Sequence, residues 1–512
     1  MPPLDDDNEP LLPEFVIRVK DSITMGLASN EKSSWTIDIV PRNWRDVHKN
    51  AFLPEIIRIG PFTFTDENET FHRLRVMEKH KVRFLNRLLR GELERRRRQI
   101  WTEEKGLLPV HERGEDDDDG GRVAEALRLD DLLEAMHILE PKTRAFYSEN
   151  FPSSYGRIGF MEMMVVDGCF LVELLRLYYD LLHKKSAGES IEDDPILTNP
   201  QILTTLRRDL LLLENQLPFF VLEKLFELIN KKNNIDHQQA VRLEVLAVTF
   251  FDPLLPQEKA RAEFHNRSGD VFMDVLNPAS KLDAQKPKAH LLDVFRSTFL
   301  TSVNEKVHKK GQNQVKPRLN PDGRSRGIVL HSASELQEAG VQFEKWKDHD
   351  LLDIKSGHRT LRVPPLSLSD YTISLLLNFV GYELSVNHPE PFFTNYLMFW
   401  NSLVNSPRDI QILRKHRIIN NMGSEKEVAE LLLRCKQVIY DLDLGYLYHE
   451  MKDVNDYCKR YYDSKYHVWW RSLIRERFSS PWTCLSLFAA IILLLLTLLQ
   501  TFYAMYAYYR PH

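Results

Sequence analysis

The sequence predicts a mainly α-helical protein with a small antiparallel β component, in which a single globular helical body precedes one C-terminal transmembrane helix. Three observations predict this fold class. Apolar side chains recur at three- and four-residue steps in many segments, as on the buried face of an amphipathic helix. Runs that alternate or cluster as strands do are few and short. Residues 478–509 contain no charged side chain, and a hydrocarbon slab needs only about 20 apolar residues in a helix.

Composition and hydrophilic breaks predict the domain organisation. Apolar residues make up 43% and aromatic residues 10% of the 512 residues, which is enough for a packed core. No break is long enough to force a boundary, so we expect one body. The expected parts are a disordered segment 1–34, a body 35–478 with loops near 100–122, 184–198, 256–288 and 305–327, a transmembrane helix 482–508 and a tail 509–512.

The elements of the body follow from periodicity and from end signals. The clearest helix, 71–90, carries Met77, Phe84 and Leu88 on one stripe. Ser332 and Glu335 have capping-box spacing, and Gly340 ends the short helix 334–339. Further helices are expected over 159–182, 202–216, 218–229, 291–303, 370–380, 395–404 and 425–440. Strands are expected over 36–40, 56–59, 341–344, 351–354 and 360–363, the last three forming one antiparallel sheet.

The C-terminal stretch has the features of a membrane span. Its centre runs through Leu485 and Leu496 with only two polar interruptions. Trp482 before the centre and Tyr503 after it mark the two headgroup layers, where aromatic rings are favoured. A buried helix of a soluble domain is the alternative, but such helices seldom run this long without a polar face.

Flanking charges predict the orientation of the span. Six Lys and Arg residues lie within 459–477 and only Arg510 follows, so the basic excess places the large N-terminal body in the cytosol. The acidic N-terminus lacks the basic and apolar regions of a secretory signal peptide. We therefore expect a tail-anchored, single-pass protein of the plasma membrane, with the lipid bilayer as one partner and with the sequons at Asn68 and Asn266 unmodified.

Several function classes find no support in the sequence. The net charge of -5 points to no nucleic-acid partner. Four cysteines are spread singly, without the spacing of a disulfide framework or of a zinc site. The sequence has neither a glycine-rich phosphate loop nor a histidine pair at metal-binding helical spacing, so we expect no cofactor and no metal.

One motif has the spacing of a hydrolase nucleophile elbow, Gly323-Arg324-Ser325-Arg326-Gly327. Such an elbow needs a buried strand before the serine and a helix directly after it. Here prolines and charges precede Ser325, and a short β-like run follows it. We therefore interpret the match as chance, and note that the basic loop would equally suit phosphorylation of Ser325.

The segment Asp209-Leu210-Leu211-Leu212-Leu213-Glu214-Asn215-Gln216-Leu217-Pro218-Phe219 predicts a tight helix-helix corner. Pro218 disfavours helix just before it and suits the start of the next helix. The side chains of Glu214, Asn215 and Gln216 are suited to satisfy the backbone groups that such a corner exposes, while Phe219 and the leucines bury its faces. Asp209 and Glu214 are five residues apart, which splays them on a helix, so we predict a structural motif rather than a paired acid-base site.

These residues resemble the plant family catalogued as domain of unknown function 247, whose members carry an acidic-Leu-Leu-Glu-Asn-Gln-apolar-Pro-Phe-Phe motif like residues 209–220. Further matching blocks are Ile39-Val40-Pro41, Phe52-Leu53-Pro54, Ile59-Gly60-Pro61, Met77-Glu78 with Lys81, Asp167-Gly168-Cys169-Phe170, His290-Leu291-Leu292-Asp293, Ala339-Gly340-Val341-Gln342-Phe343, Asn378 with Glu383, Pro481-Trp482 and Gln500-Thr501-Phe502-Tyr503. The likeness covers residues 35–511. A departure is Phe62, where many relatives have Tyr.

The resemblance implies a mainly helical body with one C-terminal membrane helix and no established enzymatic activity. Members at the grass self-incompatibility loci look like pollen-side recognition determinants. We therefore expect a membrane-anchored, non-enzymatic plant protein that acts in protein-protein recognition or signalling, with pollen-stigma self-incompatibility as a candidate process. Its expected partners are an unidentified protein and, as homo- or hetero-oligomers, family relatives. The alternative is a membrane-tethered hydrolase that uses Ser325.

Overall fold

The structure is a computed structural model, and it describes most of the body and the C-terminal helix. The described residues are 36–47, 49–62, 70–90, 127–148, 156–187, 194–232, 241–254, 288–300, 303, 331–347, 349–357, 359–386, 391–421, 423–436, 445–463 and 481–509. The predicted segment 1–34 and the nucleophile-elbow motif around Ser325 lie outside these ranges.

The N-terminal half of the body is helical and gathers around one long helix, α7 (Arg157–Ala187). Because α7 carries apolar side chains on nearly all sides, it is buried by neighbours on several faces. These neighbours are α4 (Thr70–Leu88), α6 (Leu129–Arg144), α9 (Phe219–Lys232) and α10 (Leu243–Phe251). The remaining elements of this half are α2 (Arg42–Val47), α3 (Lys49–Phe52), α8 (Pro200–Asp209), η1 (Asp252–Leu254) and α13 (Leu291–Ser297).

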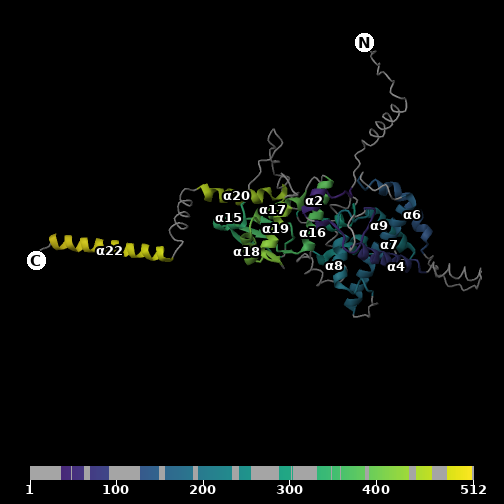
Figure 1. Cartoon of the computed structure of the whole chain (residues 1–512), viewed down its shortest axis with the longest axis horizontal. Helices are drawn as coiled ribbons and strands as arrows, with labels where there is room; N and C mark the ends of the chain where they lie inside the picture. Colours follow the sequence, from purple (N-terminus) through teal and green to yellow (C-terminus); the bar gives the residue numbers. More distant parts are fainter. Residues whose placement is uncertain are drawn as a thin grey trace, which may run out of the picture.

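The C-terminal half lies at the other end of the body in Figure 1, with α16 (Asp370–Ser385) between the halves. α16 packs on α3, α8 and α13 of the first half and on α17 (Phe392–Leu403) of the second. The other helices are α15 (Ala333–Glu338), α18 (Pro407–Lys415), α19 (Glu425–Cys435), η2 (Gly445–Leu447) and α20 (Tyr448–Asp463). α15 begins with the predicted capping box of Ser332 and Glu335, and Gly340 follows it at φ 90°.

The β component is small, as predicted, and its pairing is mixed. β1 (Gln342–Lys345) pairs in parallel with β3 (Thr360–Val363), and β2 (Lys355–Ser356) pairs antiparallel with β3. β4 (Leu366–Leu368) and β5 (Ile419–Asn421) form a second, parallel pair. The expectation of antiparallel pairing throughout was therefore wrong for β1, because the chain crosses over between β1 and β3 through residues 346–359.

Several predicted element boundaries were wrong. Residues 36–40 and 56–59 are not strands, apart from one bridge between Ile37 and Tyr147. Residues 351–354 are not a strand either, and 351–352 form a turn. The helix expected over 202–216 ends at Asp209, and the following residues form turns. The helix expected over 291–303 ends at Ser297, and that over 425–440 ends at Cys435. The helices α2, α3, α6, α10, α18 and α20 were not predicted.

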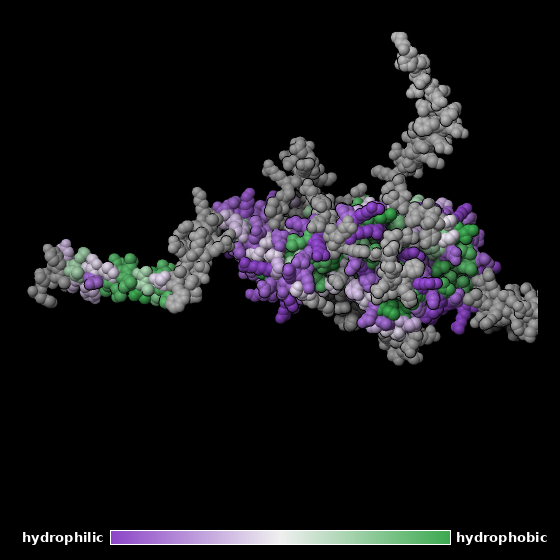
Figure 2. All heavy atoms as spheres, in the orientation of Figure 1, coloured by the Kyte–Doolittle hydropathy of each residue, from purple (hydrophilic) through white to green (hydrophobic). Residues whose placement is uncertain are grey.

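The C-terminal helix α22 (Pro481–Tyr509) contains the predicted span. Its stretch Leu485–Tyr506 is long and apolar enough to cross a membrane, and none of its most apolar 18-residue window is buried. Leu485, Leu496 and Tyr503 are exposed, and the apolar surface is visible along the helix in Figure 2. In Figure 1 the helix lies apart from the body. The side chain of Trp482 lies outside the described part of the chain.

Candidate functional site

The predicted corner lies at the centre of the N-terminal half. α8 ends at Asp209, α9 begins at Phe219, and every residue from 206 to 219 is buried. Pro218 immediately precedes α9, as its fixed φ and missing N–H favour. The backbone N–H of Phe219 donates to the carbonyl of Ala289 over 2.7 Å, which ties the start of α9 to the segment before α13. We call Asp209, Glu214, Asn215 and Gln216 the polar corner.

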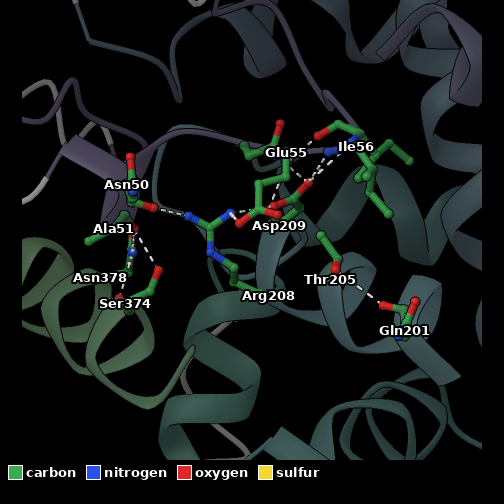
Figure 3. Close-up of polar contacts among 12 residues, drawn as sticks. Asn50, Ala51, Glu55, Ile56, Gln201, Thr205, Arg208, Asp209, Ser374 and Asn378 are labelled. Carbon is green, nitrogen blue, oxygen red and sulfur yellow. Dashed lines mark hydrogen bonds and ion pairs between the residues drawn. The ribbon is translucent and has the colours of Figure 1, made fainter. Parts of the chain in front are cut away.

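Asp209 holds a turn of the N-terminal segment. Its Oδ2 accepts hydrogen bonds from the backbone N–H groups of Glu55 and Ile56, both at 2.8 Å, and of Ile57 at 3.2 Å. Its Oδ1 lies 2.8 Å from Nη1 of Arg208, and Nη2 of the same guanidinium donates to the carbonyl of Asn50 (Figure 3). The carboxylate and the guanidinium thus fasten two successive parts of one segment, which we call the strap (residues 36–47 and 49–62).

Asn215 uses both ends of its amide on backbone groups. Its Oδ1 accepts from the N–H of Ile59 at 2.6 Å. Its Nδ2 donates to the carbonyls of Ile57 at 3.1 Å and of Asp209 at 2.8 Å. The strap residues on either side of Arg58 therefore pair with a side chain where a strand would pair with another strand, so 56–59 needs no sheet to satisfy these backbone groups.

Glu214 and Gln216 bind two further segments. Oε1 of Glu214 accepts from the N–H of Val40 at 2.5 Å and from Nη2 of Arg45. Nε2 of Gln216 donates to the carbonyls of Leu210 at 2.7 Å and Leu212 at 2.9 Å, which are carbonyls of the corner itself. Its Oε1 accepts from the N–H of Leu292 at 3.2 Å, in the first turn of α13.

A buried ion pair between α4 and α7 extends the arrangement. Nζ of Lys81 lies 2.7 Å from Oδ1 of Asp167, and Oδ2 of Asp167 accepts from the N–H of Gly60 at 2.9 Å. Lys81 also donates to the carbonyl of Arg58. Gly60 has φ 78°, and a Cβ built on it would lie 2.7 Å from the carbonyl oxygen of Gln216, so only glycine fits this close approach.

Polar side chains of α16 complete the contacts of the strap. Oδ1 of Asn378 accepts from the N–H of Leu213 at 2.8 Å, and its Nδ2 donates to the carbonyl of Ala51 at 2.9 Å. Oγ of Ser374 donates to the same carbonyl at 2.6 Å (Figure 3). The strap is thus held from α7, from the polar corner and from α16.

Burial dominates the electrostatics of the site. It raises the pKa of Asp209 to about 6, although Arg208 and the three backbone N–H groups favour the charged form. It also raises the pKa of Glu214, against the effect of Arg45, and that of Asp167, against the effect of Lys81. Within the described ranges, no group of three or more His, Cys, Asp or Glu side chains could hold a metal ion.

The structure brings together the predicted corner residues, but their partners differ from the expected ones. Gln216 and Asn215 do bind carbonyls of the corner, whereas Asp209, Glu214 and Oδ1 of Asn215 bind the strap. Lys81 and Asn378 were not predicted as part of the site. A signal for Lys81 was available, because it lies between Met77 and Phe84 on the apolar stripe of its helix, where an unpaired charge is costly.

Comparison with known proteins gives the family context. A family model described as a plant protein of unknown function, DUF247, matches residues 37–496. The Arabidopsis thaliana protein described as UPF0481 protein At3g47200 is 28% identical over 496 residues, which cover 94% of this chain and 88% of that protein. Another from Arabidopsis thaliana, described as putative UPF0481 protein At3g02645, is 22% identical over 557 aligned positions, with 95% and 94% covered. No solved structure matches the chain.

Proposed function

We propose, from the premise that the chain belongs to the DUF247 family of plant proteins, that it is a membrane-anchored, non-enzymatic protein of recognition or signalling. The observation that carries the non-enzymatic part is the use of the polar corner. Asp209 accepts three backbone N–H bonds, and the amide of Asn215 makes three more hydrogen bonds. Groups engaged in this way hold the fold and leave little capacity for a substrate.

Anchoring is proposed to occur through α22, which is apolar and exposed. Deletion of residues 481–512 should release the body into the soluble fraction under carbonate washing, whereas the full chain should stay with the membranes. A chain with Leu493→Ala and Leu494→Ala in α22 is a suitable control, because it keeps the length and apolar character of the helix and should stay membrane-bound. A truncated chain that remains folded and resists extraction would contradict α22 as the anchor.

The orientation is proposed from the basic residues before the span, which place the body on the cytosolic side of the plasma membrane. Asn68 and Asn266 lie in glycosylation sequons and should therefore remain unmodified. A mass shift that is sensitive to a glycosidase and lost in Asn68→Gln or Asn266→Gln would contradict the proposed orientation and place the body on the other side of the membrane.

Recognition is proposed to involve another protein, with self-incompatibility as the candidate process in the family. The test is co-purification from detergent-treated whole plant extracts, which contain both the full chain and the chain lacking residues 481–512. The shorter chain is the control for contacts made through the lipid. A partner that binds both chains and is lost when surface residues of the body are changed supports recognition by the body. Binding restricted to the full chain would assign it to the membrane helix.

The competing hydrolase function depends on Ser325, which lies outside the described residues. A serine-reactive activity probe should not label the full chain, and Ser325→Ala should leave both the labelling and the thermal stability unchanged. Labelling that is lost in Ser325→Ala would overturn the non-enzymatic proposal.

A further inference from the structure

Helix α20 is the last described helix before the membrane helix α22, and it contacts the body through a buried stripe that half-buried tyrosines flank. Of its 16 residues, only Met451, Val454 and Cys458 are buried. It lies on β2 and η2 and reaches α15 and α17 through the residues beneath it. We call the surface under α20, formed by β2, η2 and the facing residues of α15 and α17, the seat of α20. A helix of this length is marginally stable without tertiary contacts, so its position depends on the seat.

The seat of α20 is incompletely filled. A small cavity, with room for about one water molecule, lies between α20 and the body. It is lined by His331, Leu336, Leu361, Phe399, Ser402, Leu403, Met451, Val454 and Asn455. Oδ1 of Asn455 is buried and has no hydrogen-bond partner among the described residues. Lining atoms that face a void lose their dispersion contacts, so this contact is weaker than a fully packed one.

The polar contacts of α20 lie at the rim of the seat. Oη of Tyr457 donates to the carbonyl of Ala339 over 3.2 Å, and Oη of Tyr462 donates to the carbonyl of Glu335 over 2.9 Å. Oε2 of Glu450 accepts from the N–H and the Oγ of Ser356 at 2.7 and 2.9 Å. The side chains of α20 in these contacts are half-buried, so water can replace each bond when the helix leaves.

We propose that α20 is a detachable coupling helix, which leaves its seat as a unit while the rest of the body stays folded. Segments with few buried apolar contacts and rim hydrogen bonds open locally at a lower free energy than the core. In the sequence, α20 is followed by residues 464–480 and then by α22. A force on α22, or a partner that binds it, would therefore act on the contact between α20 and its seat before it acts on the rest of the body. The coupling of α20 to the membrane helix rests on the proposed anchoring through α22. The detachment of α20 from its seat does not depend on that proposal.

Three native thiols report on the detachment. Cys458 in α20, Cys169 in α7 and Cys435 in α19 are all buried, with exposed fractions of 0%, 0% and 1%. A buried thiol reacts with an alkylating agent only after it becomes exposed. All three thiols have almost no exposed surface, so Cys169 and Cys435, on helices of the body, serve as internal controls for Cys458 on α20.

The experiment measures alkylation of the full chain in lipid nanodiscs, with Cys484→Ser removing the thiol of the membrane helix. Iodoacetamide labelling of each cysteine is followed by peptide mass spectrometry, and each rate is divided by the rate in denaturant. We expect Cys458 to react at least about tenfold faster than Cys169 and Cys435. Asn455→Leu, which places an apolar side chain at the cavity and removes the Oδ1 that has no partner among the described residues, should slow labelling of Cys458 and leave the other two unchanged.

Fraying of the end of α20 is separated from detachment by a second reporter near its start. Met451→Cys replaces a buried residue three positions into the helix, and its thiol should react about as fast as Cys458. Protection of Met451→Cys together with reactive Cys458 would overturn detachment as a unit. Equal rates for Cys458, Cys169 and Cys435 would overturn the proposal as well, because the three would then open only with the whole body.

Discussion

The polar corner and the region of α17 and α20 both bury asparagine side chains, but they differ in how far the amides are hydrogen-bonded. In the corner, both ends of the Asn215 amide are hydrogen-bonded, as are those of Asn378 beside it. On α17 and α20, Oδ1 of Asn395, Asn401 and Asn455 is buried and has no hydrogen-bond partner among the described residues. A buried amide oxygen without a hydrogen-bond partner costs free energy that a hydrogen-bonded one recovers, so we expect the asparagines of the corner to stabilise the fold more than those of α17 and α20.

The largest expected effect is at Asp209. Asp209→Ala leaves three backbone N–H groups without their acceptor and removes the buried carboxylate that pairs with Arg208, so the free energy of unfolding should fall by about 3 to 5 kcal/mol. Chemical unfolding of the full chain in detergent micelles measures it. Asp453→Ala on the exposed face of α20 is the control and should change the stability by less than about 0.5 kcal/mol. If the two variants were equally stable, the corner would not hold the strap.

The pH dependence of the corner provides the next effect. Burial raises the pKa of Asp209 from its ordinary value of 3.8 to about 6 in the folded chain, so the folded state binds this proton more tightly than the unfolded state. The resulting stability is fully present below pH of about 4 and is lost as the pH rises through about 6. Relative to Asp209→Asn, the wild-type chain should therefore lose up to about 3 kcal/mol between these values. A constant difference across this range would show that Asp209 titrates normally.

A direct comparison of two asparagines sharpens the contrast. Asn215→Ala removes three hydrogen bonds and leaves the N–H of Ile59 and the carbonyl of Ile57 without this partner, which should cost about 1 to 3 kcal/mol. Asn455→Ala removes an amide whose oxygen has no partner in the described part of the chain, and should cost less than about 1 kcal/mol. Thermal melts of both variants in one detergent test this order. The reverse order would mean that the seat of α20, and not the corner, holds the fold.

The smallest expected effect is a gain in the free energy of unfolding. Asn455→Leu fills part of the cavity under α20 with an apolar side chain and should stabilise the chain by about 0.5 to 1 kcal/mol. Asn215→Leu is the matched control and should destabilise it, because the same change there breaks three hydrogen bonds. The sign of the shift in melting temperature decides the outcome, and a loss in both variants would contradict an underfilled seat.

The sequence by itself determined the elements whose signals are local. The capping box of Ser332 and Glu335 lies within one helical turn, and the span within α22 depends only on 22 consecutive residues. The stripe of α4 likewise repeats at the helical period, because each backbone N–H of a helix pairs four residues away. The corner residues were also recognisable, since Pro218 and the clustered polar groups before it are adjacent in the chain.

Only the tertiary structure decided what the corner holds and which path the strap takes. Asp209 binds the N–H of Glu55, 154 residues away in sequence, and Glu214 binds that of Val40, 174 residues away. The apolar alternation of the strap is the same as that of a strand, so its local pattern predicted strands at 36–40 and 56–59. A buried backbone N–H needs one hydrogen-bond acceptor, and that acceptor can come from a neighbouring strand or from a side chain. In the strap, buried carboxylates and amides are the acceptors, so no neighbouring strand is needed.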